Sequence, residues 1–261
     1  MQAADNRETG VSDRKKRRKR AIDAGMGVAV SMAAVLFTLL LTGLGGGSAI
    51  TNPPWVRAIE AGLAKRGYDW LAIDVSDRIA TVSGQAPDVD SQRYGFDAAE
   101  AELNREHGHD LAVIVDAVSL EGGAAGIGAA LAALGPQPEL AACQQAFFAT
   151  LQGRRINFAP GSAELDGDNR RLLDTLSGVA IRCRAYRIEV GGHTDLTGSP
   201  ASNLDLSTAR AETVRGYLVT KGVTAEGLSA VGFGQTRPIE RARTLDANAK
   251  NRRIEFTVSA N

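Results

Sequence analysis

The sequence predicts an α+β fold that follows a single membrane-spanning helix, and three observations support this prediction. Residues 24–42 carry no charge and follow an unbroken basic block. From residue 55 onward, stretches with strand-like alternation of apolar and polar residues are interspersed with stretches of helical spacing. Both cysteines of the chain lie in this later part. Interspersed strands and helices favour mixed sheets covered by helices on one face.

The N-terminal region predicts a cytoplasmic tail, residues 1–20, and a transmembrane anchor, residues 21–44. The basic run Arg14–Arg20 precedes the uncharged segment Ala24–Thr42. As a helix this segment would be about 28 Å long, close to the thickness of about 30 Å of a bilayer core. Basic residues before a span favour the cytoplasmic side. The chain after the span would therefore lie in the periplasm, and the protein in the inner membrane with a single pass.

A cleaved signal peptide is the alternative. Gly47-Ser48-Ala49 provides small residues suited to cleavage, and the product would then be periplasmic or associated with the outer membrane. The uncharged run is longer than a usual signal, which favours the anchor. Because the basic block already serves as a topology signal, no nucleic-acid partner is predicted.

Residues 45–54 contain Gly45-Gly46-Gly47-Ser48 and two prolines, which predict a short linker. A small α/β domain is expected over residues 55–120. Its elements are helices at 56–65 and 96–105, and strands at 71–75, 79–82 and 111–118, with a turn at Asp77. Residues 121–138 are rich in glycine and alanine and end in Gly-Pro-Gln-Pro, which predicts a second linker.

A second domain is predicted over residues 139–261. The alternating β and α patterns indicate a mixed sheet of the βαβαβ type with helices on one face. The expected helices cover 139–151, 165–179 and the region of 206–218, and the expected strands cover 155–158, 186–190, 228–234 and 254–258.

The candidate site lies where the second of these strands ends. Gly191 and Gly192 would let the backbone approach another element closely, and Asp195 follows them. On the next helix, Arg210 falls within the apolar stripe that includes Leu206 and Val214. A guanidinium cannot lose its charge there, so it needs an anion. An acid beside an arginine, with no nucleophile or second base, predicts a clamp for a zwitterion.

Several blocks in this region, in order and spacing, resemble the OmpA-like C-terminal domain, a family that binds peptidoglycan non-covalently. The resemblance covers about residues 143–258. Its blocks are Gly192-His193-Thr194-Asp195, Asn203, Leu206-Ser207, Arg210-Ala211 and Asn251-Arg252-Arg253-Ile254-Glu255-Phe256.

The resemblance implies that Asp195 and Arg210 hold the diaminopimelate-type residue of the peptidoglycan stem peptide, the acid on its ammonium and the arginine on its carboxylate. It implies that Thr194 and Asn203 help to line the same pocket. Asn157, Gly161 and Arg253 are weaker candidates from neighbouring loops. In one place the sequence departs from the family, because Leu245–Ala249 replaces a glycine-arginine pair before Asn251.

The first domain resembles the BON domain, a small module of envelope proteins, through the order of its elements and Gly84. This resemblance implies association with envelope surfaces or other envelope proteins. Cys143 and Cys183 favour a disulfide if they lie in an oxidising compartment, and related domains often carry such a pair. Two buried thiols are the alternative.

The predicted function is a membrane-anchored periplasmic protein that tethers the envelope to the cell wall. An internal ion pair between Asp195 and Arg210 is the structural alternative, and His193 alone at a strand end is expected to be structural. The sequence has no phosphate-binding loop, nucleophile elbow or metal-ligand cluster, so no enzyme, cofactor or metal is predicted. Two other functions stay open. A proton-driven motor stator would need an ionisable residue such as Asp23 in its helix, and a wall-remodelling enzyme is the less favoured alternative.

Overall fold

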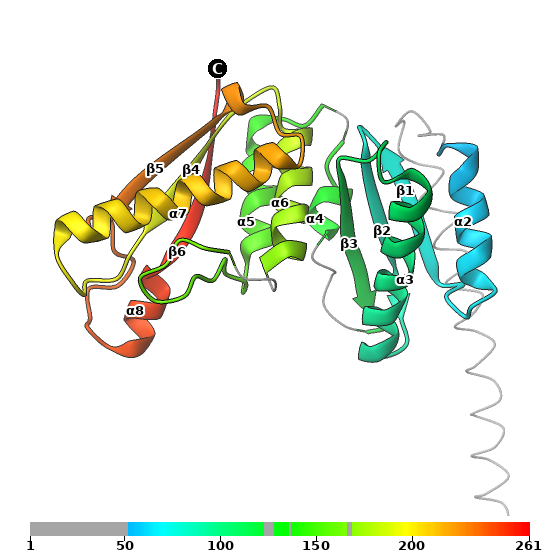
Figure 1. Ribbon diagram of the computed structural model, residues 1–261, viewed down its shortest axis with the longest axis horizontal. Coiled ribbons are helices and arrows are strands. Elements are labelled where there is room, and N and C mark those ends of the chain that lie inside the picture. The colour runs from blue at the N-terminus through cyan, green and yellow to red at the C-terminus, as the bar shows by residue number, and fades with distance from the viewer. Residues whose placement is uncertain (1–51, 123–127, 136, 166–168) are drawn as a thin grey trace, which may run out of the picture. The chain divides into compact units, whose positions relative to one another are not determined.

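The computed structural model describes residues 52–122, 128–135, 137–165 and 169–261 (Figure 1). These belong to one compact unit. The predicted tail 1–20, the predicted anchor 21–44, Asp23 and residues 45–51 of the first linker lie outside the described residues. Within the described ranges, no helix combines the length and apolar character needed to cross a membrane.

The first sheet contains three strands in the order β1-β2-β3, and it confirms the strands expected between residues 71 and 118. Strand β1 (Leu71–Ser76) pairs antiparallel with β2 (Ile79–Ala86), and β2 pairs parallel with β3 (Val113–Leu120). Asp77 and Arg78 form the two-residue turn between β1 and β2, and both have positive φ angles, of 51° and 63°. This is the conformation that a tight hairpin requires.

Two helices pack on this sheet. Helix α2 (Pro54–Ala64) buries Val56, Ile59 and Leu63. Helix α3 (Val89–His107) begins earlier than the spacing predicted, because the Asp88 carboxylate accepts a hydrogen bond of 2.7 Å from the Ser91 amide and caps it.

The second sheet has the strand order β5-β4-β6 and is mixed, as predicted. Strand β4 (Arg187–His193) pairs parallel with β5 (Leu228–Gly234) and antiparallel with β6 (Arg253–Ser259). The helices are α5 (Leu140–Leu151), α6 (Arg170–Arg182), α7 (Pro200–Thr220) and α8 (Leu245–Asn251), with a 3₁₀ turn, η2 (Ala225–Gly227), before β5. Along β6, Ile254, Phe256 and Val258 are buried and the residues between them are more exposed. Helices α5 and α7 cover this sheet (Figure 1).

Two expectations about this domain need correction. The strand expected at 155–158 is reduced to one isolated bridge between Phe158 and Leu165. The Asn169 side chain takes the place of a neighbouring strand: its Oδ1 accepts from the Asn157 amide at 3.0 Å, and its Nδ2 donates to the Asn157 carbonyl at 2.9 Å. The helix expected at 165–179 occupies 170–182 instead.

Helix α6 lies between the two sheets and most of its residues are buried. A Cβ atom on Gly178 would come within 2.7 Å of Leu131 and 3.3 Å of Val115 of β3. Arg171 pairs with Asp97 and with Asp116 of the first sheet, the latter at 3.5 Å. Leu131 belongs to the short helix α4 (Ala129–Ala132) within the region expected to be a linker, and it is 2% exposed. This part of the chain therefore contributes to the core between the sheets.

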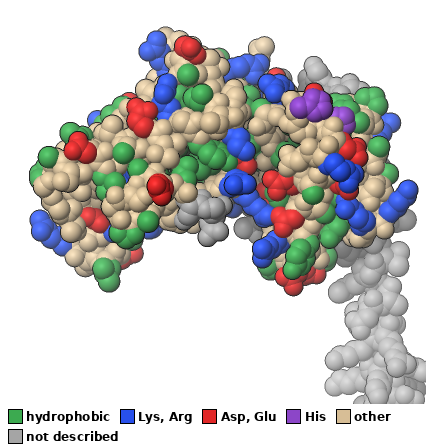
Figure 2. All heavy atoms as spheres, in the orientation of Figure 1, with side chains coloured by type: hydrophobic (Ala, Val, Ile, Leu, Met, Phe, Trp, Pro, Cys, Tyr) green, Lys and Arg blue, Asp and Glu red, His purple; other side chains and the backbone are tan. Residues whose placement is uncertain are grey.

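A disulfide joins Cys143 of α5 to Cys183 at the end of α6, with Cα atoms 5.9 Å apart. Over the face shown in Figure 2, basic and acidic side chains are interspersed, in keeping with the formal net charge of zero.

Candidate functional site

The glycines at the end of β4 allow α7 to lie directly against the strand. A Cβ atom on Gly192 would lie 2.1 Å from the carbonyl oxygen of Ser207, which is backbone and cannot move aside. The Ser207 hydroxyl in turn accepts a hydrogen bond of 2.8 Å from the Gly234 amide of β5. The close backbone approach expected at these glycines is therefore the approach of α7, and it fixes where Arg210 emerges.

A cavity of about 140 Å³ lies beside the end of β4 and is rich in arginine. Its lining consists of Arg155, Ile156, Asn157, Phe158, His193, Arg210, Ala249, Arg252 and Arg253. Two of the four guanidinium groups, those of Arg252 and Arg253, pair with Asp195 and Glu255. The positive charges of Arg155 and Arg210 remain and favour an anionic ligand.

Arg210 is held rigidly in this cavity. Its Nε donates to the Ser162 carbonyl at 2.9 Å and its Nη2 to the Ala159 carbonyl at 3.2 Å. The guanidinium also lies 5.0 Å from the centre of the Phe158 ring. Arg210 is only 6% exposed, yet in the described part of the chain it pairs with no carboxylate. Carbonyl oxygens orient its charge without neutralising it.

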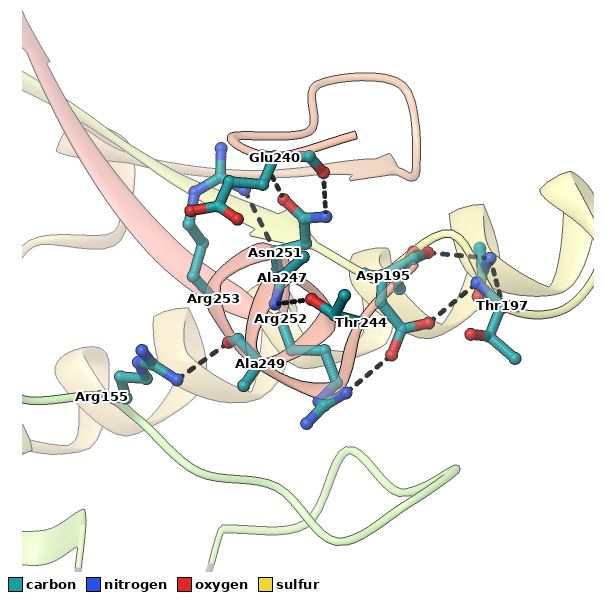
Figure 3. A network of polar contacts seen from close by, with 12 residues as sticks. Arg155, Asp195, Thr197, Glu240, Thr244, Ala247, Ala249, Asn251, Arg252 and Arg253 are labelled. Carbon is teal, nitrogen blue, oxygen red and sulfur yellow. Dashed lines mark hydrogen bonds and ion pairs between the residues drawn. The ribbon is translucent and has the colours of Figure 1, made fainter. Parts of the chain in front are cut away.

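Asp195 pairs with Arg252 at the edge of the cavity. Its Oδ2 accepts from Arg252 Nη1 at 2.8 Å, and its Oδ1 accepts from the Thr197 amide at 2.9 Å. Figure 3 shows the Arg252 side chain extending from the end of α8 toward Asp195. Burial raises the pKa of Asp195, but the hydrogen bonds from Arg252 and Thr197 outweigh this and hold it below its usual value. The carboxylate is therefore ionised and ready to accept a cation.

Asp195 and Arg210 do not pair with each other within the described residues, so the internal ion pair between them, the structural alternative, is not what the structure contains. Burial lowers the pKa of Arg210, and the nearby charge of Arg252 lowers it further while Asp195 opposes this. The acid and the two arginines thus form one electrostatic group.

Thr194 and Asn203 hold the loop that carries Asp195, and neither lines the cavity. The Thr194 amide donates to the Gly234 carbonyl at 2.9 Å. Asn203 Nδ2 donates to the Thr197 carbonyl at 2.9 Å and to Gln235 Oε1 at 2.7 Å. Both are nearly buried, with 4% and 7% exposure. They position the carboxylate through the backbone around it.

His193 lines the cavity and is 1% exposed. Its ring stacks on Phe233 with centroids 5.1 Å apart. Its Nε2 lies 3.2 Å from Glu255 Oε2, too far off line for a hydrogen bond but close enough for an ion pair when the ring is charged. The contact with His193, together with Arg253, lowers the pKa of Glu255 to about 2 although burial opposes it. His193 thus packs against Phe233 and also lines the cavity.

Arg252 and Arg155 are the site residues that sequence reasoning missed. Arg252 belongs to the Asn251-Arg252-Arg253 block, so its signal was present, but only the structure shows that it reaches Asp195. The departure at Leu245–Ala249 forms most of α8, capped by the Thr244 hydroxyl, which accepts from the Ala247 amide at 3.2 Å. Arg155 Nη1 donates to the Ala249 carbonyl at 3.0 Å (Figure 3).

Comparison with known proteins identifies a family for part of this chain. The OmpA family model matches residues 157–252, which contain Asp195, Arg210 and Arg252. Three residues of the cavity lining, Arg155, Ile156 and Arg253, lie just outside the match. Residues 157–252 form an OmpA-like domain.

Individual relatives match the same part of the chain. The peptidoglycan-binding protein ArfA of Mycobacterium tuberculosis is 36% identical over 107 residues, which are 41% of this chain and 33% of ArfA. The probable lipoprotein YiaD of Escherichia coli is 39% identical over 107 residues, 38% of this chain and 49% of YiaD. The crystal structure of the peptidoglycan-associated lipoprotein from Burkholderia pseudomallei is 27% identical, covers 41% of this chain and 92% of that one, and has a TM-score of 0.39. The chain thus spans about a third of ArfA and about half of YiaD.

Proposed function

We propose that this chain is a cell-envelope protein that binds peptidoglycan non-covalently through the OmpA-like domain, without cleaving it. One observation carries the proposal: a buried arginine, Arg210, is fixed by carbonyl groups and has no carboxylate partner in the described chain. A buried charge without a counter-ion is costly, so the site is built to receive an anion. ArfA, which the domain resembles, is named for peptidoglycan binding.

The ligand group that fits best is the side-chain end of a diaminopimelate residue in the stem peptide, where an ammonium and a carboxylate share one carbon. Its carboxylate would bind Arg210, with Arg252 close enough to contribute. Its ammonium would bind Asp195, because a carboxylate has about four acceptor positions and only two are occupied by Arg252 and Thr197. Thr194 and Asn203 support this arrangement by fixing the Asp195 loop.

A cosedimentation experiment with purified sacculi tests the proposal. The full chain is expected in the pellet, and Asp195→Ala and Arg210→Lys are expected in the supernatant. Lysine keeps the charge but cannot keep the planar set of hydrogen bonds to Ser162 and Ala159 while also binding a carboxylate. Arg187→Ser is the matched control, because Arg187 is an exposed arginine at the start of β4, away from the cavity lining.

Free ligands sharpen this test. Meso-diaminopimelate is expected to release the protein from sacculi, whereas cadaverine, which has the same two ammonium groups and no carboxylate, is not. Equal release by both would remove the role of Arg210 as a carboxylate site. Soluble wall fragments in the supernatant would contradict binding without cleavage.

The proposed cellular location rests on the wall-binding proposal and on the N-terminal sequence. The basic run Arg14–Arg20 and the uncharged residues 24–42 support an inner-membrane anchor that joins the membrane to the wall. Membranes washed with alkaline carbonate are expected to retain the full chain, and N-terminal sequencing is expected to find residues 1–20 still attached. A mature chain that begins near residue 50 would instead support a cleaved signal.

A further inference from the structure

The outer edge strands of the two sheets differ in how many of their outward-facing backbone groups are hydrogen-bonded. At β1 three outward-facing backbone groups near the middle of the strand are occupied. Asn52 donates to the Ile73 carbonyl at 2.8 Å and accepts from the Val75 amide at 2.9 Å, and Glu60 accepts from the Ile73 amide at 2.9 Å. Pairing of another chain with this edge would first require these hydrogen bonds to break, so the edge is protected.

At β6 only the C-terminal half of the edge is occupied. Gln144 of α5 donates to the Phe256 carbonyl at 2.9 Å and accepts from the Val258 amide at 2.8 Å. In an antiparallel strand, alternate residues direct both backbone groups to the same side. The amide and carbonyl of Ile254 and the amide of Phe256 therefore also point to this edge, and no side chain of the described residues binds them.

A groove of about 740 Å³ runs along this open half of β6. It is formed by the C-terminal end of α5, residues 153–156, and β6 itself. Phe148 and Ile239 line it and are each 59% exposed, which is unusual for large apolar side chains. Apolar side chains beside unpaired strand groups are the features that bind an extended peptide by strand addition.

The positive charge of the groove favours an acidic occupant. Arg154 and Arg155 are exposed, hydrogen-bond only to the carbonyls of Thr150 and Ala249, and form no ion pair within the described chain. The other two basic residues of the lining are already neutralised, Lys250 by acidic neighbours and Arg253 by Glu255. Two uncompensated guanidinium groups remain.

We propose that the groove beside β6 binds an extended, acidic polypeptide segment of a partner protein, which adds as a strand next to Ile254. A second copy of this chain would bring the same basic rim to an already basic groove. A peptidoglycan stem peptide lacks the regular α-peptide backbone that strand addition requires. The proposal does not depend on wall binding, although Arg155 and Arg253 belong to both the groove and the arginine-rich cavity.

Fluorescence anisotropy with a labelled peptide tests this proposal. The probe is Val-Glu-Val-Glu-Val-Glu with blocked ends, and the full chain is expected to bind it. Replacing each glutamate of the probe by lysine is expected to abolish binding. Two further probes carry N-methyl groups on alternate backbone nitrogens, one on the valines and the other on the glutamates. The probe whose methylated edge faces β6 is expected to bind at least tenfold more weakly, because that edge then lacks its hydrogen-bond donors.

Variants of the protein locate the contact. Arg154→Ser is expected to weaken binding about fivefold, the scale of a single partly exposed ion pair, and Phe148→Ser to weaken it at least as much. Arg187→Ser is the control for loss of a positive charge elsewhere. Asp195→Ala is expected to bind the peptide normally but to lose its binding to sacculi. This result would separate the present proposal from the proposed function.

Three results would overturn the proposal: equal binding of the lysine probe, equal binding of both methylated probes, or unchanged binding by Phe148→Ser. Sedimentation equilibrium that shows a dimer disrupted by Phe148→Ser, with no peptide binding, would assign the groove to a second copy and also overturn it. Release of bound probe by soluble wall peptides would assign the groove to the wall.

Discussion

Glycine at positions 192 and 232 is required by distance rather than by backbone angle. A Cβ atom at Gly232 would lie 2.1 Å from Thr208 Oγ1 and 2.6 Å from the Thr208 backbone nitrogen. At both positions the obstacle includes backbone of α7, which can retreat only if the whole helix moves. Since α7 carries Arg210, these glycines set the geometry of the cavity.

Gly192→Ala is expected to lower the free energy of unfolding by about 2–4 kcal/mol, because the added methyl group overlaps the Ser207 carbonyl. Gly216→Ala on α7 is the control. It meets no atom within 4 Å, and it should change stability by at most about 1 kcal/mol, in the stabilising direction. Urea denaturation of both variants measures the difference. If Gly192→Ala had the same free energy of unfolding as the wild type, α7 would not lie as close to β4 at Gly192 as the contact with Ser207 requires.

The lowered pKa of Glu255, about 2, predicts a specific pH dependence. Above its ordinary value of 4.5 the group is ionised in both the folded and the unfolded chain, so its stabilising contribution is fully present. As the pH falls from about 4.5 to about 2, the unfolded chain takes up the proton first and the contribution is lost. The stability difference between the wild type and Glu255→Gln should therefore shrink as the pH falls from 4.5 toward 2. Denaturation at a series of pH values measures it. A difference that grew as the pH fell below 4.5 would contradict the lowered pKa of Glu255.

Among single residues, the sequence identified those with a local signal. Asp195 follows a glycine pair, and Arg210 interrupts an apolar stripe, so both stood out. Arg252 did not, because one arginine in a run of two carries no sign of its direction. Its role arises only when α8 brings it to Asp195, which lies 57 residues away in sequence.

At the level of elements, the disulfide between α5 and α6 is the strongest single constraint. It closes a loop with a sequence separation of 40 residues. Both cysteines are fully buried, and both helices contribute to the core around Phe147 and Leu176.

The double variant Cys143→Ala/Cys183→Ala is expected to lose about 2–4 kcal/mol of unfolding free energy, mainly because the unfolded chain gains freedom. Thermal denaturation of the wild type with and without reductant gives the same comparison without mutation. If reductant lowered the stability of the double variant as well, the effect would not come from the disulfide.

The elements with strong periodicity were predicted well, and those stabilised by distant side chains were not. Strand β6 alternates clearly between buried and exposed residues, and β4, β5 and β6 all lie close to the expected residues. The segment 155–158 alternates as well, yet it pairs with the amide of Asn169 instead of a strand. A sequence pattern shows that a segment prefers to be extended, but it does not show which group will occupy its backbone.

For the whole molecule, the central feature is that α6 is shared. Its core includes Ile79, Val113 and Val115 of the first sheet together with residues of the second domain. Arg182 near its end is 7% exposed and lies 3.6 Å from Asp77 in the hairpin turn. Removing either sheet would expose one side of α6 to water, so the two domains should stabilise each other.

Equilibrium unfolding is expected to follow a single transition for both domains. Both tryptophans of the chain, Trp55 and Trp70, lie in the first domain, so tryptophan fluorescence reports on it alone. Hydrogen exchange of the buried amides of α7 reports on the second domain. The two measurements should give the same free energy of unfolding. A fluorescence change at lower denaturant concentration than the loss of α7 protection would contradict a shared core.

The amide side chains of Asn52 and Gln144 give the described sheets a chemical sensitivity. Each amide uses its nitrogen and its oxygen at once, toward the carbonyl of one residue and the amide of another. Hydrolysis to a carboxylate would keep the shape but replace the donor with a second oxygen, which would face the Ile73 or Phe256 carbonyl and repel it. The substitutions Asn52→Asp and Gln144→Glu would thus each reopen a sheet edge in an otherwise intact molecule.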